Sequence, residues 1–344
     1  MKAFVIREHG GPEALKLEEV ATPQPGPGEV RVRILAAALN HLDLWVRRGV
    51  PGHAFPLPLI PGSDGVGEVA AVGRDVSRVA AGDRVIVSPG FGCGGCEACL
   101  RGEESLCPHY RILGETRDGT CAEAIVVPAT CLHIIPSGLE PLEAAALPLV
   151  LMTTWRMLIQ RARMRPGETV LVQAGGSGIG STAIQIARAL GCRVLTTVGS
   201  PEKADLARQL GADEVILYRQ ADVAREVRRL TDKQGVDIVV EHTGEATWEG
   251  SVRALRRGGR LVTCGATTGA AAGIDLRVLF FKQISLLGST MGSRADLEEA
   301  LRLVRRGALR PVIDRSFPLA HLPEAHRYLE ERRAFGKVTL AGWT

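Results

Sequence analysis

The 344-residue sequence predicts an α/β protein in which a doubly wound parallel sheet of six strands is inserted into a second, β-rich domain. Two observations predict the sheet. Apolar runs alternate with helical segments through the middle of the chain, and the turn after the first run, Ala174–Gly180, is rich in glycine. A third observation predicts the other domain, because the apolar runs before residue 149 lie between glycines and do not alternate with helices.

The first part of the chain, residues 1–149, is expected to be all-β or α+β. Val30–Ile34 alternates apolar and polar residues, as a half-buried strand does, and it follows the proline-rich Thr22–Gly28. Gly65–Gly73 and Gly82–Val87 add further strands that are bounded by glycines.

The second part begins with an apolar helix at Met152–Leu158 and then alternates regularly. Strands are expected at 169–173, 193–198, 214–217, 236–240, 259–264 and 284–288, with helices at 178–190, 201–210, 221–232 and 247–256. The end of the chain returns to mixed character, with helices at 294–306 and 321–333 and strands at 312–317 and 337–341. We therefore predict one domain of residues 1–149 plus 291–344 and another of residues 150–290.

Composition and charge limit the class of protein. The chain is 45% apolar and 23% charged, as globular proteins are, and its net charge of +4 with scattered basic pairs argues against a nucleic-acid partner. No stretch reaches the length needed to cross a membrane, and no signal peptide opens the chain, so we expect a cytoplasmic protein with no membrane partner.

The turn between the first strand and its helix predicts a phosphate-binding site. Thr169–Val172 is an apolar run, and the apolar positions of the following helix recur every three or four residues. Glycines let the backbone approach a pyrophosphate, which sits on the free N–H groups of the helix. Ser177 stands where the second glycine of a strict G-x-G-x-x-G would be, and a tight turn that only joins strand to helix is the alternative. The candidate cofactor-binding residues here are Gly175, Gly176, Ser177, Gly178, Ile179 and Gly180.

A cluster of cysteines predicts a metal site within a lobe of about residues 90–110. Cys93, Cys96, Cys99 and Cys107 have the spacing C-x2-C-x2-C-x7-C. Four thiolates satisfy tetrahedral zinc without leaving an open position, so the zinc would be structural. Four unrelated thiols, or an iron–sulfur centre, are the alternatives.

Together these features resemble the medium-chain dehydrogenase/reductase superfamily, which contains zinc alcohol dehydrogenases and quinone oxidoreductases. The resemblance covers essentially the whole chain. Its specific marks are Asn40–Asp43, Pro61–Gly67, Gly82–Val85, the four cysteines, Ala174–Gly180 and Gly336–Lys337. It implies a GroES-like catalytic domain around a Rossmann nucleotide-binding domain, assembled as a homodimer or homotetramer through Val278–Phe281 and Ile284–Thr290.

The same resemblance implies that a second, catalytic zinc has been lost. Its three ligand positions in zinc alcohol dehydrogenases correspond here to Asn40, the Ser63–Asp64 pair and Leu149, and the proton-relay positions to Leu42 and Trp45. A zinc that acts as a Lewis acid needs three protein ligands and an open position. The alternative is a rearranged site that uses His41, Asp43 and Asp64.

The nicotinamide cofactor implied by the resemblance is NADPH, with NADH as the alternative. No carboxylate stands at the tip of the second strand before Glu202, whereas NAD-selective sheets place one there. Ser200, Lys203 and Tyr218 resemble the 2′-phosphate pocket of quinone oxidoreductases that use NADPH. Further cofactor contacts are expected from Asn40, Thr153, Thr243, Gly265, Ala266 and Lys337. Lys337 is also a candidate for an ordinary surface lysine at a strand end, as opposed to one that reaches the cleft between the domains.

The resulting hypothesis is an enzyme that reduces quinones, enones, enals or enoyl thioesters by hydride transfer without a catalytic zinc. Asn40 and His41 are the candidate catalytic residues that position the ring or donate a hydrogen bond, and Trp45 lines the slot for a small electrophilic substrate. The alternatives are an alcohol dehydrogenase with an altered zinc site and a crystallin-like nucleotide-binding protein with little catalysis.

Overall fold

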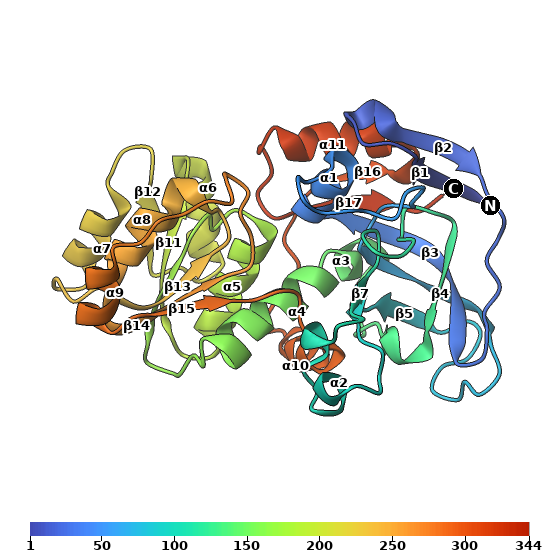
Figure 1. The fold of residues 1–344 in the computed structure, drawn as a ribbon, viewed down its shortest axis with the longest axis horizontal. Coiled ribbons are helices and arrows are strands. Elements are labelled where there is room, and N and C mark those ends of the chain that lie inside the picture. The colour runs from blue at the N-terminus through green and yellow to red at the C-terminus, as the bar shows by residue number, and fades with distance from the viewer. Residues whose placement is uncertain (344) are drawn as a thin grey trace. The chain divides into compact units, whose positions relative to one another are not determined.

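The computed structural model describes residues 1–343 and divides the chain into two compact units (Figure 1). The first unit contains Met1–Leu149, Ser293–Leu301 and the segment from Pro311 onward. The second contains Val150–Gly292 and Arg302–Arg310. Helix α10 (Arg294–Arg305) contributes residues to both units.

The first unit is built on a seven-stranded sheet that combines strands from residues 29–134 with two strands from residues 313–341. Its strand order is β16-β17-β3-β4-β5-β9, and β8 pairs with β3 off this path. The strands are β3 (Glu29–Leu39), β4 (Asp64–Val72), β5 (Arg84–Val87), β8 (Ala124–Pro128), β9 (Leu132–Ile134), β16 (Ile313–Pro318) and β17 (Lys337–Ala341). This unit also contains helices α1 (His41–Arg48), α2 (Glu97–Leu100), α3 (Pro141–Ala145) and α11 (Leu322–Glu330) and the short pair of strands β6 (Gly90–Phe91) and β7 (Arg111–Ile112).

The strand register brings three distant segments together at one end of this sheet. The C-terminal strand β17 runs antiparallel to β3 with Val338 opposite Leu39, and β4 runs antiparallel to β3 with Asp64 opposite Ala38. The beginnings of β17 and β4 therefore lie beside the end of β3 and the start of α1. This arrangement positions the polar site described below.

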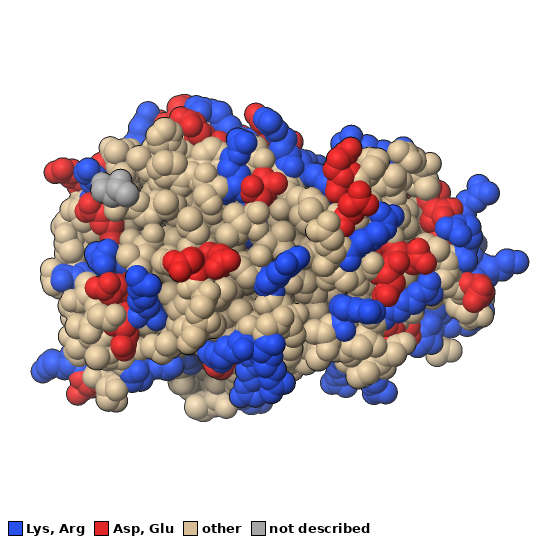
Figure 2. Space-filling view, turned by 180° about the vertical axis from the view of Figure 1, so that it is seen from behind, with Lys and Arg blue, Asp and Glu red and all other residues tan. Residues whose placement is uncertain are grey.

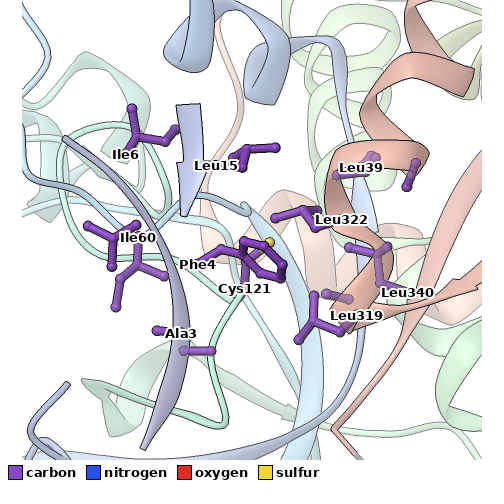
Figure 3. Packing of buried hydrophobic residues seen from close by; sticks show 14 of the residues in the cluster. Ala3, Phe4, Ile6, Leu15, Leu39, Ile60, Cys121, Leu319, Leu322 and Leu340 are labelled. Atoms are coloured by element: carbon purple, nitrogen blue, oxygen red, sulfur yellow. The ribbon is translucent and has the colours of Figure 1, made fainter. Parts of the chain in front are cut away.

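A hydrophobic cluster joins this sheet to the N-terminal hairpin of β1 (Lys2–Ile6) and β2 (Leu15–Glu19). Figure 3 shows Phe4 of the hairpin beside Cys121, between Leu322 of α11 and Leu319, and Ile6 and Leu340 of β17 belong to the same cluster. All of these side chains are buried, so removing apolar atoms here would cost both transfer and cavity free energy.

The second unit has the predicted six-stranded parallel sheet. Its order is β12-β11-β10-β13-β14-β15, so the chain reverses direction across the sheet between β10 and β13. The strands are β10 (Thr169–Val172), β11 (Arg193–Val198), β12 (Glu214–Leu217), β13 (Val236–Glu241), β14 (Leu255–Thr263) and β15 (Ser285–Gly288). The helices are α4 (Pro148–Trp155), whose first two residues belong to the first unit, α5 (Gly178–Ala189), α6 (Pro201–Gln209), α7 (Val223–Leu230), α8 (Glu245–Ala254) and α9 (Leu276–Lys282). The fold class predicted from the sequence is confirmed.

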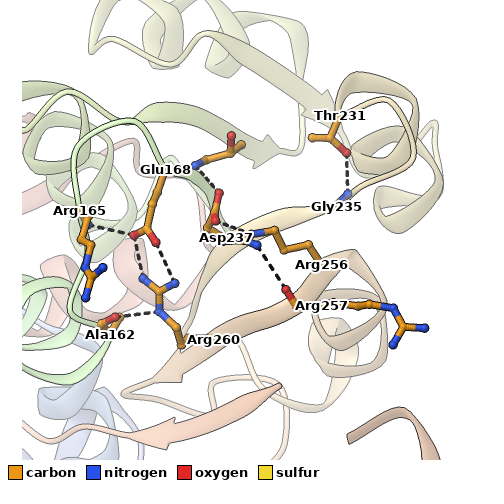
Figure 4. Close-up of polar contacts among 10 residues, drawn as sticks. Ala162, Arg165, Glu168, Thr231, Gly235, Asp237, Arg256, Arg257 and Arg260 are labelled. Carbon is orange, nitrogen blue, oxygen red and sulfur yellow. Dashed lines mark hydrogen bonds and ion pairs between the residues drawn. The ribbon is translucent and has the colours of Figure 1, made fainter. Parts of the chain in front are cut away.

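Ion pairs fix the amino ends of these parallel strands (Figure 4). Arg260 of β14 donates two hydrogen bonds to Glu168, just before β10, at 2.9 and 2.7 Å. The Asp237 carboxylate of β13 accepts from the backbone N–H of Thr169 at 2.8 Å and pairs with Arg256. Side chains thus hold three strands together at the end opposite the phosphate-binding turn.

One helix differs from the expectation drawn from the sequence. Pro141–Arg161 is long and apolar enough to cross a membrane, with a mean hydropathy of 1.4, so the expectation that no stretch reaches that length was wrong. The helix is 72% buried over its most apolar window, as the core helix of a globular domain is. Its last six residues, Arg156–Arg161, form a π-helical turn.

Surface charge is mixed in sign. On the face shown in Figure 2, basic and acidic side chains lie interspersed, with uncharged surface between them. This distribution fits the small net charge of +4.

Candidate functional site

The glycine-rich turn between β10 and α5 is held by Ser177. Its Oγ accepts a hydrogen bond from the N–H of Gly180 at 2.8 Å and so caps the helix. Gly180 has to be glycine, because a Cβ there would lie 2.3 Å from the carbonyl oxygen of Ala174. The N–H groups of Gly178 and Ile179 belong to the first helical turn and have no intrahelical acceptor, so the turn can bind an anion. The serine that departs from the strict glycine motif therefore works as a helix cap.

The turn lies at the point where the strand order reverses, which is where doubly wound sheets bind ligands. His242 follows the neighbouring strand β13, and its Nε2 lies 2.9 Å from the carbonyl oxygen of Gln173 and 3.3 Å from Ser177 Oγ. Burial lowers the pKa of His242, so the ring is neutral and Nε2–H donates to the carbonyl. His242 therefore fixes the turn and is not a candidate base.

A buried carboxylate organises the loop that follows β13. Glu241 is fully buried and accepts from the backbone N–H groups of Thr243 and Gly244 at 2.7 and 3.1 Å. It also accepts from the hydroxyls of Thr247 and Ser251 at 2.9 and 2.6 Å. These donors compensate the buried charge and fix the path of the chain at the carboxyl end of the sheet. This network was not predicted from the sequence.

The tip of β11 carries the groups expected to distinguish the two nicotinamide cofactors. Ser200 caps α6 by accepting from the N–H of Lys203 at 3.4 Å, and its hydroxyl donates to Glu202, which lowers the pKa of that carboxyl. Tyr218 lies against the same tip, since a Cβ on Gly199 would be 2.8 Å from the tyrosine hydroxyl. Arg219 is close as well, at 3.5 Å from that position. Arg219 directly follows Tyr218 in the sequence but was not among the predicted cofactor-binding residues.

The remaining residues expected to contact the cofactor in this unit lie in α4 and after β13 and β14. The hydroxyl of Thr153 is buried and has no hydrogen-bond partner within residues 1–343, as a group awaiting a ligand would be. The backbone of Thr243 accepts from both the N–H and the hydroxyl of Thr268 at 2.8 Å. Gly265 and Ala266 follow β14 in the adjacent loop.

In the first unit the structure brings Lys337 to Asn40 and Asp64. Lys337 Nζ donates to Asn40 Oδ1 at 2.5 Å and to Asp64 Oδ2 at 2.9 Å. Asn40 Nδ2 donates to the same Asp64 oxygen at 2.9 Å, and the backbone N–H of Leu149 donates to Asp64 Oδ1 at 2.7 Å. Both oxygens of this fully buried carboxylate therefore have donors. Lys337 is seated in this polar cluster of the first unit and is only 5% exposed.

Asp43, at the first turn of α1, adds a second buried carboxyl beside this cluster. Its Oδ2 accepts from the backbone N–H of Asn40 at 2.6 Å, while its Oδ1 is buried with no hydrogen-bond partner in the described part of the chain. Burial raises the pKa of Asp43 to about 7, with the nearby Asp64 carboxylate adding to the rise and Lys337 opposing it.

The other two candidate catalytic residues lie on the same helix. His41 and Trp45 are one turn apart on α1, and their rings meet edge to face with centroids 5.5 Å apart. Neither side chain is fully buried. The structure therefore brings Asn40, His41 and Trp45 together at the start of α1, as their spacing in the sequence allows.

The four cysteines form a site that fits a tetrahedral metal. Their Sγ atoms all lie within 4.8 Å of one another, which four sulfurs at about 2.3 Å from a zinc ion would satisfy. Among residues 1–343 they are the one group of three or more potential metal-ligand side chains that meet in this way. Gly92 has to be small because a Cβ there would lie 2.5 Å from Cys99 Sγ.

Backbone N–H groups stabilise two of the four cysteine sulfurs, those of Cys93 and Cys107. The N–H groups of Gly95 and Cys96 hold the pKa of Cys93 at about 6, whereas burial raises the pKa of Cys99 to about 12. Cys107 Sγ accepts from the N–H groups of Cys93 and His109 at 3.4 and 3.3 Å. Cys93 is exposed and Cys107 is buried, so one ligand faces solvent and another faces the protein.

The positions that correspond to the catalytic zinc ligands do not fit a metal. Asn40 offers an amide and Leu149 only a backbone N–H, and Asp64 is already bound by three donors. His41 and Asp43 do not join Asp64 in a ligand group within residues 1–343.

Known proteins match this chain along nearly its whole length. Residues 26–137 match the family model described as alcohol dehydrogenase GroES-like domain, and residues 178–306 match the one described as zinc-binding dehydrogenase. A quinone oxidoreductase of Pseudomonas aeruginosa is 37% identical over 98% of this chain and 99% of its own. An acryloyl-coenzyme A reductase of Sulfurisphaera tokodaii is 32% identical over 98% of this chain and 99% of its own. A solved structure described as an NAD-dependent alcohol dehydrogenase is 49% identical, covers 99% of both chains and superposes with a TM-score of 0.96.

If the four cysteines hold zinc, substitution of one of them should remove the metal. Cys96→Ser should lower the zinc content from one ion per chain to near zero, because three sulfurs no longer close the tetrahedron. Inductively coupled plasma mass spectrometry on dialysed protein measures this, and limited proteolysis reports the order of residues 90–110. Cys192→Ser is the matched control, since that buried thiol lies in the other unit and donates to the carbonyl of Arg165. Equal zinc in both variants would contradict the assignment.

The raised pKa of Asp43 predicts a pH dependence of stability. Between pH 3.8, which is the ordinary pKa of an aspartate, and about pH 7, Asp43 holds a proton in the folded protein that it has released in the unfolded chain. This stabilisation is complete below pH 4 and is lost as pH rises to 7, with an upper limit of about 4 kcal/mol. The free energy of unfolding in urea, measured from pH 4.5 to 8, should therefore fall less with pH for Asp43→Asn than for the unmodified protein. A difference between the two that is constant with pH would disprove the assignment.

Proposed function

Because the chain belongs to the zinc-binding dehydrogenases of the medium-chain dehydrogenase/reductase superfamily, which are oxidoreductases, we propose that it reduces quinones or activated alkenes with a nicotinamide cofactor and without a catalytic metal. Enones, enals and enoyl thioesters are the activated alkenes that we expect. The observation that carries this proposal is the saturation of Asp64 by Lys337, Asn40 and Leu149, which leaves no ligand set for a second zinc.

The residues present fit the cofactor. The capped turn at Ser177 offers N–H groups to a pyrophosphate, and the buried hydroxyl of Thr153 is available to a ligand. When bound, the reduced nicotinamide supplies a hydride. Asn40 is fixed by two hydrogen bonds and can orient a ring or an oxygen through its remaining N–H. A double bond conjugated to a carbonyl accepts hydride at carbon without metal assistance, and hydrogen-bond donors can then meet the charge that develops on the carbonyl oxygen.

The relatives support this substrate class without deciding it. The names quinone oxidoreductase and acryloyl-coenzyme A reductase belong to proteins that match almost the whole chain. The name alcohol dehydrogenase belongs to the solved structure with 49% identity and favours the second candidate, an alcohol dehydrogenase with an altered zinc site. The metal content separates the two, because the first candidate needs one zinc per chain and the second needs two.

The cysteine site is proposed to hold that single zinc in a structural role. Four thiolates leave no position for substrate or water, so the metal would stabilise the lobe and take no part in hydride transfer.

NADPH is proposed as the preferred cofactor, and NADH remains the alternative. Lys203 in the first turn of α6 and Arg219 beside Gly199 offer two cations near the tip of β11 to a 2′-phosphate. Glu202 is the one carboxylate in the first turn of α6, and Ser200 binds it.

We also propose that the protein forms a homodimer or homotetramer in the cytoplasm. Strand β15 is the outer strand of the six-stranded sheet, and α9, just before it, exposes Leu276, Phe280 and Phe281. An unpaired strand edge next to exposed apolar side chains is what a self-associating surface offers.

Cofactor preference has a direct test. Lys203→Ala and Arg219→Ala should each raise the Michaelis constant for NADPH by roughly tenfold or more, because a charge-assisted hydrogen bond to phosphate is lost, and should change that for NADH little. Steady-state kinetics with both cofactors measures this, with Arg208→Ala, in the last turn of α6, as the control. Equal effects on the two cofactors would exclude a 2′-phosphate site here.

The reaction itself is tested by following NADPH oxidation with quinones, enals, enoyl thioesters and simple aldehydes on protein of known metal content. Turnover of the conjugated electrophiles by protein with one zinc per chain is expected. Alcohol oxidation that requires a second metal would favour the alternative, and cofactor binding without turnover of any electrophile would remove the proposal.

A further inference from the structure

Lys337 is a buried cation whose position is fixed by the sheet. It is the first residue of β17, its backbone N–H donates to the carbonyl of Val312 at 2.8 Å, and its side chain is 5% exposed. A buried ammonium needs a counter-ion and hydrogen-bond acceptors, and Asp64 and Asn40 supply them.

The three positions that would hold a catalytic metal converge on this one charge. Asn40 accepts from the ammonium, Asp64 forms the ion pair with it, and the backbone of Leu149 donates to the other oxygen of Asp64. All four residues belong to the first unit. The site therefore contains a positive charge, which is supplied by the side chain of Lys337 and not by a bound metal ion.

The ammonium also determines which way the Asn40 amide faces. Lysine can only donate, so Oδ1 of Asn40 must face Lys337, and an ionised Asp64 can only accept, so Nδ2 must face Asp64. Within the described residues this leaves Asn40 with one N–H and Lys337 with one N–H that have no acceptor. Both remaining groups are donors, so a ligand that meets them has to bring an acceptor oxygen.

We propose that Lys337 is a positioning residue that takes the place of the catalytic metal as a fixed cation and orients Asn40 as a hydrogen-bond donor. The substrates would then be electrophiles whose reacting carbon is conjugated to a carbonyl oxygen, since charge that develops on that oxygen meets donors. This substrate part rests on the proposed function, whereas the role of the ion pair does not.

A double-mutant cycle tests the ion pair through stability. Lys337→Met leaves the Asp64 carboxylate buried without a counter-ion and should lower the melting temperature by on the order of 10 °C. Adding Asp64→Asn removes the uncompensated charge and keeps an acceptor for Leu149, so the double variant should recover most of that loss. Lys282→Met is the matched control, because within residues 1–343 the hydrogen bonds of Lys282 go to the backbone carbonyls of Arg253 and Leu255 and not to a carboxylate. A double variant no more stable than Lys337→Met would overturn the proposal, as would two zinc ions per chain in the unmodified protein.

Kinetics then distinguishes positioning from cofactor binding. In the stable double variant, kcat for a conjugated electrophile should fall by on the order of tenfold or more while the Michaelis constant for NADPH stays the same, and Lys337→Arg, which keeps the charge, should retain more activity than Lys337→Met. A raised Michaelis constant for NADPH with unchanged kcat would make Lys337 a cofactor ligand and overturn the positioning role. If the unmodified protein turns over no electrophile, the proposed function and the substrate part fail, and the stability cycle still decides the role of the ion pair.

Discussion

The buried ion pair between Lys337 and Asp64 is the constraint on which the polar site of the first unit depends. It joins the C-terminal strand β17 to β4 across β3, at the row where the register places Val338 opposite Leu39 and Asp64 opposite Ala38. An ion pair taken out of water is favourable only when further hydrogen bonds complete it. Asn40 and the backbone of Leu149 provide these bonds, so the charge pair fixes the residues around it as well as itself.

The second unit solves a similar problem with a single charge. Glu241 is buried at the carboxyl end of β13 and is satisfied by four donors from the loop and helix that follow it, so its charge shapes the backbone next to the phosphate-binding turn. His242 links that loop to the turn through the carbonyl of Gln173. At the amino ends of the strands, Glu168 and Arg260 pair instead. One end of the sheet is therefore held by ion pairs and the other by a carboxylate that accepts hydrogen bonds from neutral groups.

Features that depend on local spacing could be predicted from the sequence. The cysteine pattern, the glycine-rich turn and the alternation of strands and helices each lie within a few residues or one repeat, and the fold class follows from them. The partners of Lys337 could not be predicted in this way. Lys337 lies 297 residues from Asn40 and 273 residues from Asp64 in the sequence, and only the strand register brings the three together. Arg219 and the apolar length of Pro141–Arg161 were visible in the sequence and were missed. Arg219 lies outside the hydroxyl, ammonium and phenol pattern of the expected pocket. In the long helix, Pro141 and Pro148 each begin a helical segment, so the sequence suggests two shorter helices.

The uneven burial of the cysteine ligands sets the chemical weak point of the lobe. Cys93 is the exposed member, and two backbone N–H groups stabilise its thiolate, whereas Cys107 lies inside the protein. Thiolate character and solvent access together govern attack by oxidants and alkylating reagents. Oxidation of the lobe would therefore begin at Cys93. A bound metal ion would then lose its exposed ligand first, while the buried sulfur of Cys107 was still intact.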